Sequence, residues 1–143
     1  MGKLGTATVS GPEGDVVDWG AVGWRQAEDN VRRLRQRIFT ASKAGDLNKV
    51  RSLQKLMLRS RSNALVSVRR VAEVNAGRKT AGVDGRVVLA GWEKADMAAW
   101  LQRGAAAWRP WPVKRVFIPK AGGKRRGLGI PTDTANCAVA QVI

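Results

Sequence analysis

The stretch WRQAEDNVRRLRQRIFTASKAGDLNKVRSLQKLM, residues 24–57, decides the fold of this 143-residue chain. Its first apolar side chains recur every three or four residues, which is the period of one helix face. They are Trp24, Ala27, Val31, Leu34, Ile38 and Ala41. Gly45 and Asp46 then interrupt the pattern, because glycine commonly ends a helix and aspartate commonly caps the next one. The stretch therefore predicts an αα-hairpin, two helices joined by a tight turn.

The chain that precedes this stretch is less regular. Residues 1–18 show no sustained apolar period and carry charges of both signs, so we expect a disordered leader there. Asp18 is a candidate N-cap for the first helix. Gly20 and Gly23 weaken the first turns, which moves the expected start of the helix toward Trp24.

The second helix is expected to continue beyond the quoted stretch. Apolar residues keep helical spacing from Val50 to Val71. Ser60, Ser62 and Asn63 are expected to loosen the middle of this helix, because their side chains compete for backbone hydrogen bonds. Residues 19–75 are thus expected to form one basic helical hairpin.

Positive charge dominates this hairpin. The whole chain has a net charge of +15, and the segment from Arg25 to Arg70 holds thirteen Lys or Arg side chains against three acids. A solvated surface normally mixes both signs, so a face that contacts nucleic-acid phosphates explains the excess better. Our candidates for these contacts are Arg32, Arg33, Arg35, Arg37, Lys49, Arg51, Lys55, Arg59, Arg69 and Arg70.

Several classes of protein are excluded by composition. The chain has no histidine and one cysteine, Cys137, so histidine-based catalysis, an internal disulfide and zinc sites of cysteine or histidine are ruled out. No stretch approaches the ~20 apolar residues of a membrane-spanning helix, and the N-terminus lacks the apolar core of a signal peptide. We therefore expect a cytoplasmic protein with no membrane partner.

Residues 76–112 are expected to form a loop and a short third helix. Three glycines in NAGRKTAGVDGRV, residues 75–87, mark the loop, and apolar spacing between Gly91 and Gly104 indicates the helix. Four tryptophans in and after this helix are candidates either for stacking on nucleobases or for the core, and burial in the core is the more common role of such residues. They are Trp92, Trp100, Trp108 and Trp111.

Residues 113–143 begin with VKRVFIPKAGGKRRGLGIPT, which predicts a β-hairpin. Val113 to Pro119 is rich in β-branched and aromatic residues, a Gly-Gly turn follows, and Arg126 to Ile130 returns. Thr132 is placed to cap a final helix. The fold class expected is α+β, mainly α, with the basic αα-hairpin, a short third helix, this β-hairpin and a C-terminal helix.

The β-hairpin concentrates cations. Lys114 and Lys120 share a face by the two-residue period of a strand, and Arg126 is expected to converge on Lys120 across the turn. Two or three cations around one point suit a triphosphate or the backbone of a nucleic-acid strand.

Three segments in this order resemble the N-terminal region of bacterial group II intron reverse transcriptases, the maturases. They are the basic helices ending in SVRRV, the loop GRKTAGVDG, and WRPWPVKRVFIPKAGGKRRGLGIPT. The resemblance implies that the helices bind intron or template RNA and that a fingers-type β-hairpin holds the triphosphate of the incoming nucleotide. Matched by position, the triphosphate-binding residues are Lys114, Arg115, Lys120 and Arg126.

The chain also departs from the pattern of this family. Ala135 and Asn136 stand where the family has an Asp-Arg pair, so two interpretations of the last eleven residues stay open, a functional continuation or a frame-altered tail. The resemblance places the catalytic aspartates in a palm beyond Ile143, so we expect a truncated tail, no catalytic residue, no metal site and no polymerisation by this chain alone. Mg²⁺ is expected only with a complete palm.

Two alternatives to an RNA-binding fragment remain open. In the first alternative the chain is one part of a split reverse transcriptase whose palm is encoded separately. In the second it is a generic basic nucleic-acid-binding protein. RNA is the expected partner in the first reading, together with the palm. Duplex DNA would serve equally well in the second.

Overall fold

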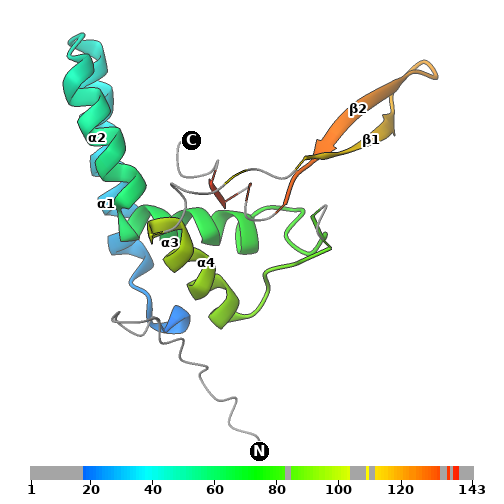
Figure 1. Ribbon diagram of the computed structural model, residues 1–143, viewed down its shortest axis with the longest axis horizontal. Helices are drawn as coiled ribbons and strands as arrows, with labels where there is room; N and C mark the ends of the chain where they lie inside the picture. Colours follow the sequence, from blue (N-terminus) through cyan, green and yellow to red (C-terminus); the bar gives the residue numbers. More distant parts are fainter. Residues whose placement is uncertain are drawn as a thin grey trace, which may run out of the picture.

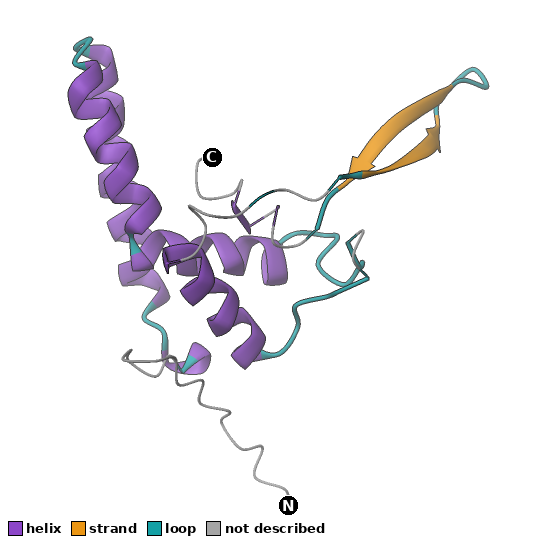
Figure 2. Cartoon of the chain, in the orientation of Figure 1, coloured by secondary structure: helices purple, strands orange, loops and turns teal. Residues whose placement is uncertain are grey.

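Helices make up most of the described chain, and a β-hairpin extends from them (Figures 1 and 2). The computed structural model describes residues 18–82, 85–103, 109, 112–132, 135 and 137–138. The elements are η1 (Trp19–Ala21), α1 (Trp24–Lys43), α2 (Leu47–Arg59), α3 (Arg61–Arg69), the π-helical η2 (Arg70–Val74), α4 (Gly91–Arg103), β1 (Lys114–Pro119) and β2 (Arg125–Ile130). The predicted class, α+β and mainly α, is confirmed. The leader predicted over residues 1–18 lies outside the described residues except for its last residue, Asp18.

The α1–α2 arm, residues 24–59, forms an αα-hairpin within residues 19–75, the range over which the sequence predicted one. Gly45 adopts a φ of 73°, a conformation that glycine reaches without the strain a side chain would cause. Asp46 caps α2 by accepting a hydrogen bond of 3.1 Å from the backbone N–H of Lys49. At the other end of the arm, α1 begins at Trp24, and Asp18 caps the short η1 helix instead of α1. Val22 and Gly23 thus separate η1 from α1, while Gly20 lies within η1.

The helix predicted from Val50 to Val71 is divided into α2 and α3 by a bend at Ser60, within the part that Ser60, Ser62 and Asn63 were expected to loosen. Ser60 has extended backbone angles, and its hydroxyl accepts a hydrogen bond of 3.3 Å from the N–H of Asn63. The buried Asn63 amide donates to the carbonyl of Met57, at 3.2 Å. These side chains satisfy the ends of two helices, and α3 leaves the arm to pack against α1 and α4.

A small core lies where α3, η2 and α4 meet. We call these three elements, together with η1, the helical body. Val68 and Leu101 are among its most buried side chains. Its other buried members are Ala64, Leu65, Val71, Ala72, Val88, Ala98 and Cys137. Trp19, Trp24 and Trp100 pack against the core from its edges. Among the predicted stacking tryptophans, Trp100 is therefore a core residue, Trp92 is partly exposed, and the other two lie outside the described residues.

Cys137 belongs to this core, although from the sequence it was grouped with the β-hairpin in residues 113–143. Its side chain is buried in the same cluster as Val68 and Leu101. Thr132 precedes it and accepts a hydrogen bond of 3.1 Å from the N–H of Ala135, as expected of a helix cap. The chain therefore returns to the helical body after the β-hairpin.

The β-hairpin, residues 114–130, pairs β1 and β2 in antiparallel register. Lys114 lies opposite Ile130, Phe117 opposite Gly127 and Ile118 opposite Arg126. Gly122 and Gly123 both have positive φ, which suits the tight turn at the tip. In Figure 1 the β-hairpin projects from the helical body on the side away from the α1–α2 arm.

Candidate nucleic-acid interface

A row of three cations runs along the outer side of α2. Arg51, Lys55 and Arg59 follow one another at intervals of four residues, and all three side chains are exposed. Leu53 and Met57 lie on the opposite, buried side of the same helix. A helix rises 1.5 Å per residue, so neighbouring cations of the row are about 6 Å apart along the axis. Such a row presents several point charges to one extended polyanion.

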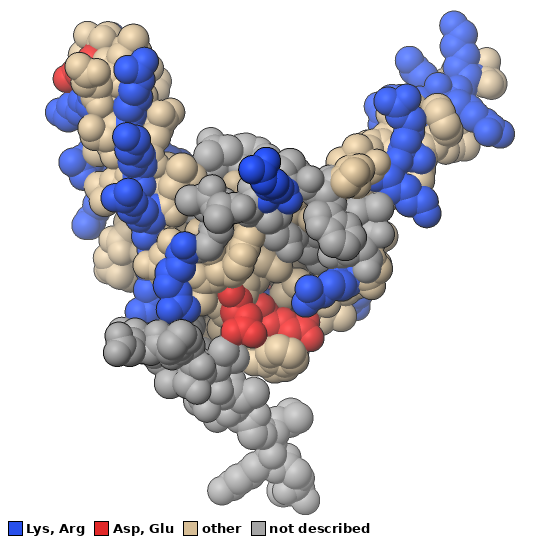
Figure 3. All heavy atoms as spheres, in the orientation of Figure 1, with Lys and Arg blue, Asp and Glu red and all other residues tan. Residues whose placement is uncertain are grey.

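α1 adds further cations to the arm. Arg33 and Arg37 are exposed and one helical turn apart, while Arg35 is half-buried. Arg32 is exposed as well, but it forms an ion pair of 3.2 Å with Asp29 on the same helix. Lys49 on α2 and Arg70 at the base of the arm are also exposed. Figure 3 shows Lys and Arg along both the arm and the β-hairpin, and a group of acidic side chains on the helical body.

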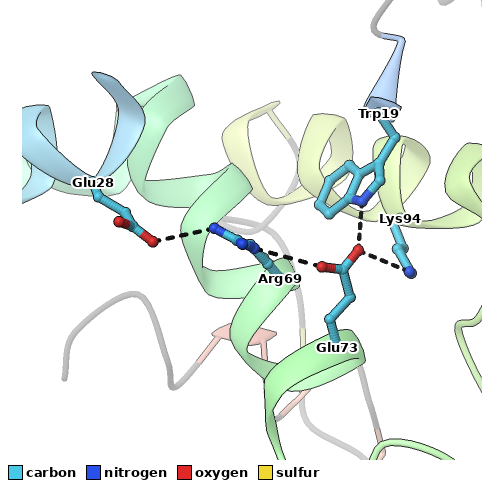
Figure 4. Close-up of polar contacts among 5 residues, drawn as sticks. All are labelled: Trp19, Glu28, Arg69, Glu73 and Lys94. Carbon is cyan, nitrogen blue, oxygen red and sulfur yellow. Dashed lines mark hydrogen bonds and ion pairs between the residues drawn. The ribbon is translucent and has the colours of Figure 1, made fainter. Parts of the chain in front are cut away.

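Arg69, another of the ten candidates, is held inside a polar cluster (Figure 4). Its guanidinium forms ion pairs with Glu28, at 3.2 Å, and with Glu73, at 3.5 Å. The guanidinium carbon also lies 4.6 Å from the centroid of the Trp24 ring, within the range of a cation–π contact. These contacts join α1 to α3, so Arg69 has a structural role and we leave it out of the interface.

Glu73 is the centre of this polar cluster. Its Oε1 accepts hydrogen bonds from Trp19 Nε1, at 2.7 Å, and from Lys94 Nζ, at 2.9 Å. The π-helical turn of η2, closed by a 2.9 Å bond from Asn75 N to Arg70 O, carries Glu73 to this position. One carboxylate thus ties η1, α3 and α4 together at the base of the arm.

The pKa of the Glu73 carboxyl is shifted by this environment. Burial raises the pKa, but hydrogen bonds from Lys94 and Trp19 and the charges of Lys94 and Arg69 lower it by more. The pKa of Glu73 in the folded protein is therefore below its ordinary value of 4.5.

The stability of the fold should fall in acid as a result. A carboxyl with a lowered pKa contributes stability above its unfolded-state pKa and loses it as the pH falls through the folded-state value. We expect the free energy of unfolding to decline below about pH 4.5, with a flatter acid limb in the Glu73→Gln variant. Urea unfolding followed by circular dichroism at several pH values measures both curves. Parallel curves for the two proteins would contradict the assignment to Glu73.

The β-hairpin divides the four predicted triphosphate ligands between its two faces. The register puts Lys114, Lys120 and Arg126 on one face and Arg115 on the other. Lys120 and Arg126 are diagonal neighbours next to the turn, about 7–8 Å apart between Cα atoms. Lys114 is six residues from Lys120, about 20 Å along the strand. The fold therefore brings Lys120 and Arg126 together, but neither Lys114 nor Arg115 joins them.

Comparison with known proteins identifies the helical part of the chain. The family model for the N-terminal domain of reverse transcriptase matches residues 19–101, from η1 into α4. The chain belongs to this family. It is also similar to maturase-like protein 1 of Euglena gracilis, with 25% identity over 95 residues. That alignment covers 66% of this chain and 21% of the relative, so the chain spans about a fifth of the relative's length.

The matched region of this reverse transcriptase N-terminal domain includes both the arm and the polar cluster. The sequence contains one signal for the cluster, because Glu73 is an isolated acid that closely follows the basic pair Arg69 and Arg70. Such an acid commonly neutralises a nearby cation. Its partners Trp19 and Lys94 lie 54 and 21 residues away, beyond the reach of local patterns.

Two further findings concern other classes of site. Within the described ranges, no group of three or more Cys, Asp or Glu side chains is placed to hold a metal ion. No described helix of the reverse transcriptase N-terminal domain is both long and apolar enough to cross a membrane.

Proposed function

We propose that the reverse transcriptase N-terminal domain binds RNA through its α1–α2 arm, as part of a group II intron-type reverse transcriptase or maturase. The observation that carries the proposal is the row of exposed cations on α2. None of the ion pairs found among the described residues involves Arg51, Lys55 or Arg59. The row on α2 is therefore uncompensated by acids and suits phosphate groups.

The target follows from the family and from chemistry. Intron RNA or template RNA is the polyanion that a reverse transcriptase or maturase handles, and the name of the Euglena relative, a maturase-like protein, supports an intron RNA. The protein acts in the cytoplasm of a bacterium in this proposal, together with its RNA.

The β-hairpin has a second part in the proposal. Lys120 and Arg126 hold the triphosphate of an incoming nucleotide when a palm is present. The palm supplies the carboxylates and the Mg²⁺ for polymerisation, whether it lies on the same polypeptide or on a separate one. The 143 residues by themselves bind RNA without extending a primer.

Titration of a fluorescently labelled intron RNA with the full chain, followed by anisotropy, tests the proposal. The logarithm of the binding constant should fall linearly with the logarithm of the salt concentration, by about 0.7–0.9 per phosphate contact. An affinity that salt leaves unchanged would sink the idea. Competition with duplex DNA separates the alternatives, because equal competition indicates a generic basic nucleic-acid-binding protein.

A further inference from the structure

Phe117 is an aromatic side chain that the fold leaves in solvent. It lies in the middle of β1, and 61% of its surface is exposed. Its neighbours along the strand, Val116 and Ile118, point to the other face and are half-buried. The apolar surface of this ring is therefore available for contact with a ligand.

The opposite strand leaves this ring uncovered. Phe117 pairs with Gly127, and the next residue on that face of β2, Gly129, also has no side chain. A Cβ placed on Gly127 would lie 3.8 Å from Phe117 Cε1 and 3.8 Å from Arg115 Cδ. The ring and the Arg115 side chain therefore both lie beside Gly127, at the position where a residue with a side chain would be the cross-strand partner of Phe117.

The positive charge around Phe117 indicates which kind of ligand this face would bind. Arg115 and Arg125 share the face of Phe117, and the six cations between Lys114 and Arg126 have no acid among them. A second copy of this hairpin would be repelled by the like charge. A nucleic-acid strand satisfies both features, because its phosphates match the arginines and its bases match the ring.

We propose that Phe117 is a stacking platform for an unpaired base of a single-stranded RNA, with Arg115 and Arg125 holding the adjacent phosphates. The proposal deepens the RNA-binding function and rests on it. It assigns the two faces of the β-hairpin to different groups, with Lys120 and Arg126 on the triphosphate face and Phe117 on the strand face. A base inside a duplex has no free ring face to offer, so this face selects unpaired strands.

The test compares the full chain with its Phe117→Leu variant on a short single-stranded RNA and on the same strand without bases. Leucine keeps the apolar character of the strand but has no π-face. We expect the variant to bind the intact strand roughly 5- to 100-fold more weakly, as for the loss of one stacked base. Its affinity for the abasic strand should equal that of the unmodified chain, since phosphate contacts are retained.

Two further variants make the result specific. Phe117→Trp should retain binding to the intact strand. Leu128→Ala should leave it unchanged, because Leu128 is also exposed on the same hairpin but points to the opposite face. Equal affinity of Phe117→Leu and the unmodified chain for the intact strand overturns the stacking platform while leaving RNA binding by the arm in place. If the unmodified chain binds no RNA at all, the proposed function itself fails.

Discussion

Replacement of Arg51, Lys55 and Arg59 by alanine is expected to weaken RNA binding by on the order of 100-fold at about 0.1 M salt. Each phosphate contact on a single strand releases about 0.7 counterion, which is worth about 0.7 logarithmic unit at that concentration. Three contacts therefore account for about two logarithmic units of affinity. The slope of affinity against salt should fall by about 2 in the same variant. Anisotropy titrations over a range of salt concentrations measure both quantities.

A matched control variant distinguishes the effect of this row on RNA binding from the effect of net charge alone. Arg78, Lys79 and Arg103 are also exposed, and their replacement removes the same three charges from outside the arm. This control should bind several-fold tighter than the α2 variant and keep most of the salt slope. Equal losses in the two triple variants would show that the row on α2 is no interface.

The free energy of unfolding of the Glu73→Ala variant is expected to be about 2 kcal/mol lower than that of the unmodified chain, because hydrogen bonds to a charged group are lost. The change leaves Trp19 Nε1 and the largely buried Lys94 ammonium without their acceptor. Removal of one partner from such a pair costs more than the pair contributes, since the remaining charge stays desolvated. For a chain of this length the melting temperature should drop by roughly 5–10 °C.

Thermal unfolding followed by circular dichroism gives this value, and Asp29→Ala is its control. Asp29 also loses an ion pair, with Arg32, but that pair lies on the exposed side of α1. Exposed pairs within one helix contribute little, so the control should melt within about 2 °C of the unmodified chain. A similar drop in both variants would mean that the Glu73 cluster does not hold the arm to the body.

Local signals in the sequence were sufficient for the turns and for the two strands of the β-hairpin. Gly45 with Asp46, and the Gly-Gly pair at residues 122 and 123, occur where the backbone needs positive φ or a cap. The period of two residues placed Lys114 and Lys120 on one face, and the turn was expected to bring Arg126 near Lys120, which agrees with the observed register. These features depend on neighbours within a few residues, which a single sequence displays directly.

Features that depend on distant partners were not predictable in this way. Ser60, Ser62 and Asn63 marked the place of the bend, but the direction that α3 takes depends on its packing against α1 and α4. Arg69 looked like its exposed neighbours in the sequence, but Glu28, its ion-pair partner, is 41 residues away. Charge counting cannot tell a cation that stabilises the fold from one that is free for a ligand.

The burial of Cys137 changes how the β-hairpin is connected to the rest of the molecule. The chain leaves the helical body after α4, forms β1 and β2, and comes back to share the core with Val68 and Leu101. The β-hairpin is therefore anchored at both of its ends, like a closed loop. A force applied to the hairpin by a bound strand would therefore be transmitted to the contact between α3 and α4. A recombinant fragment that stops at residue 101, where the family match ends, would lack Cys137 and leave a cavity in the core.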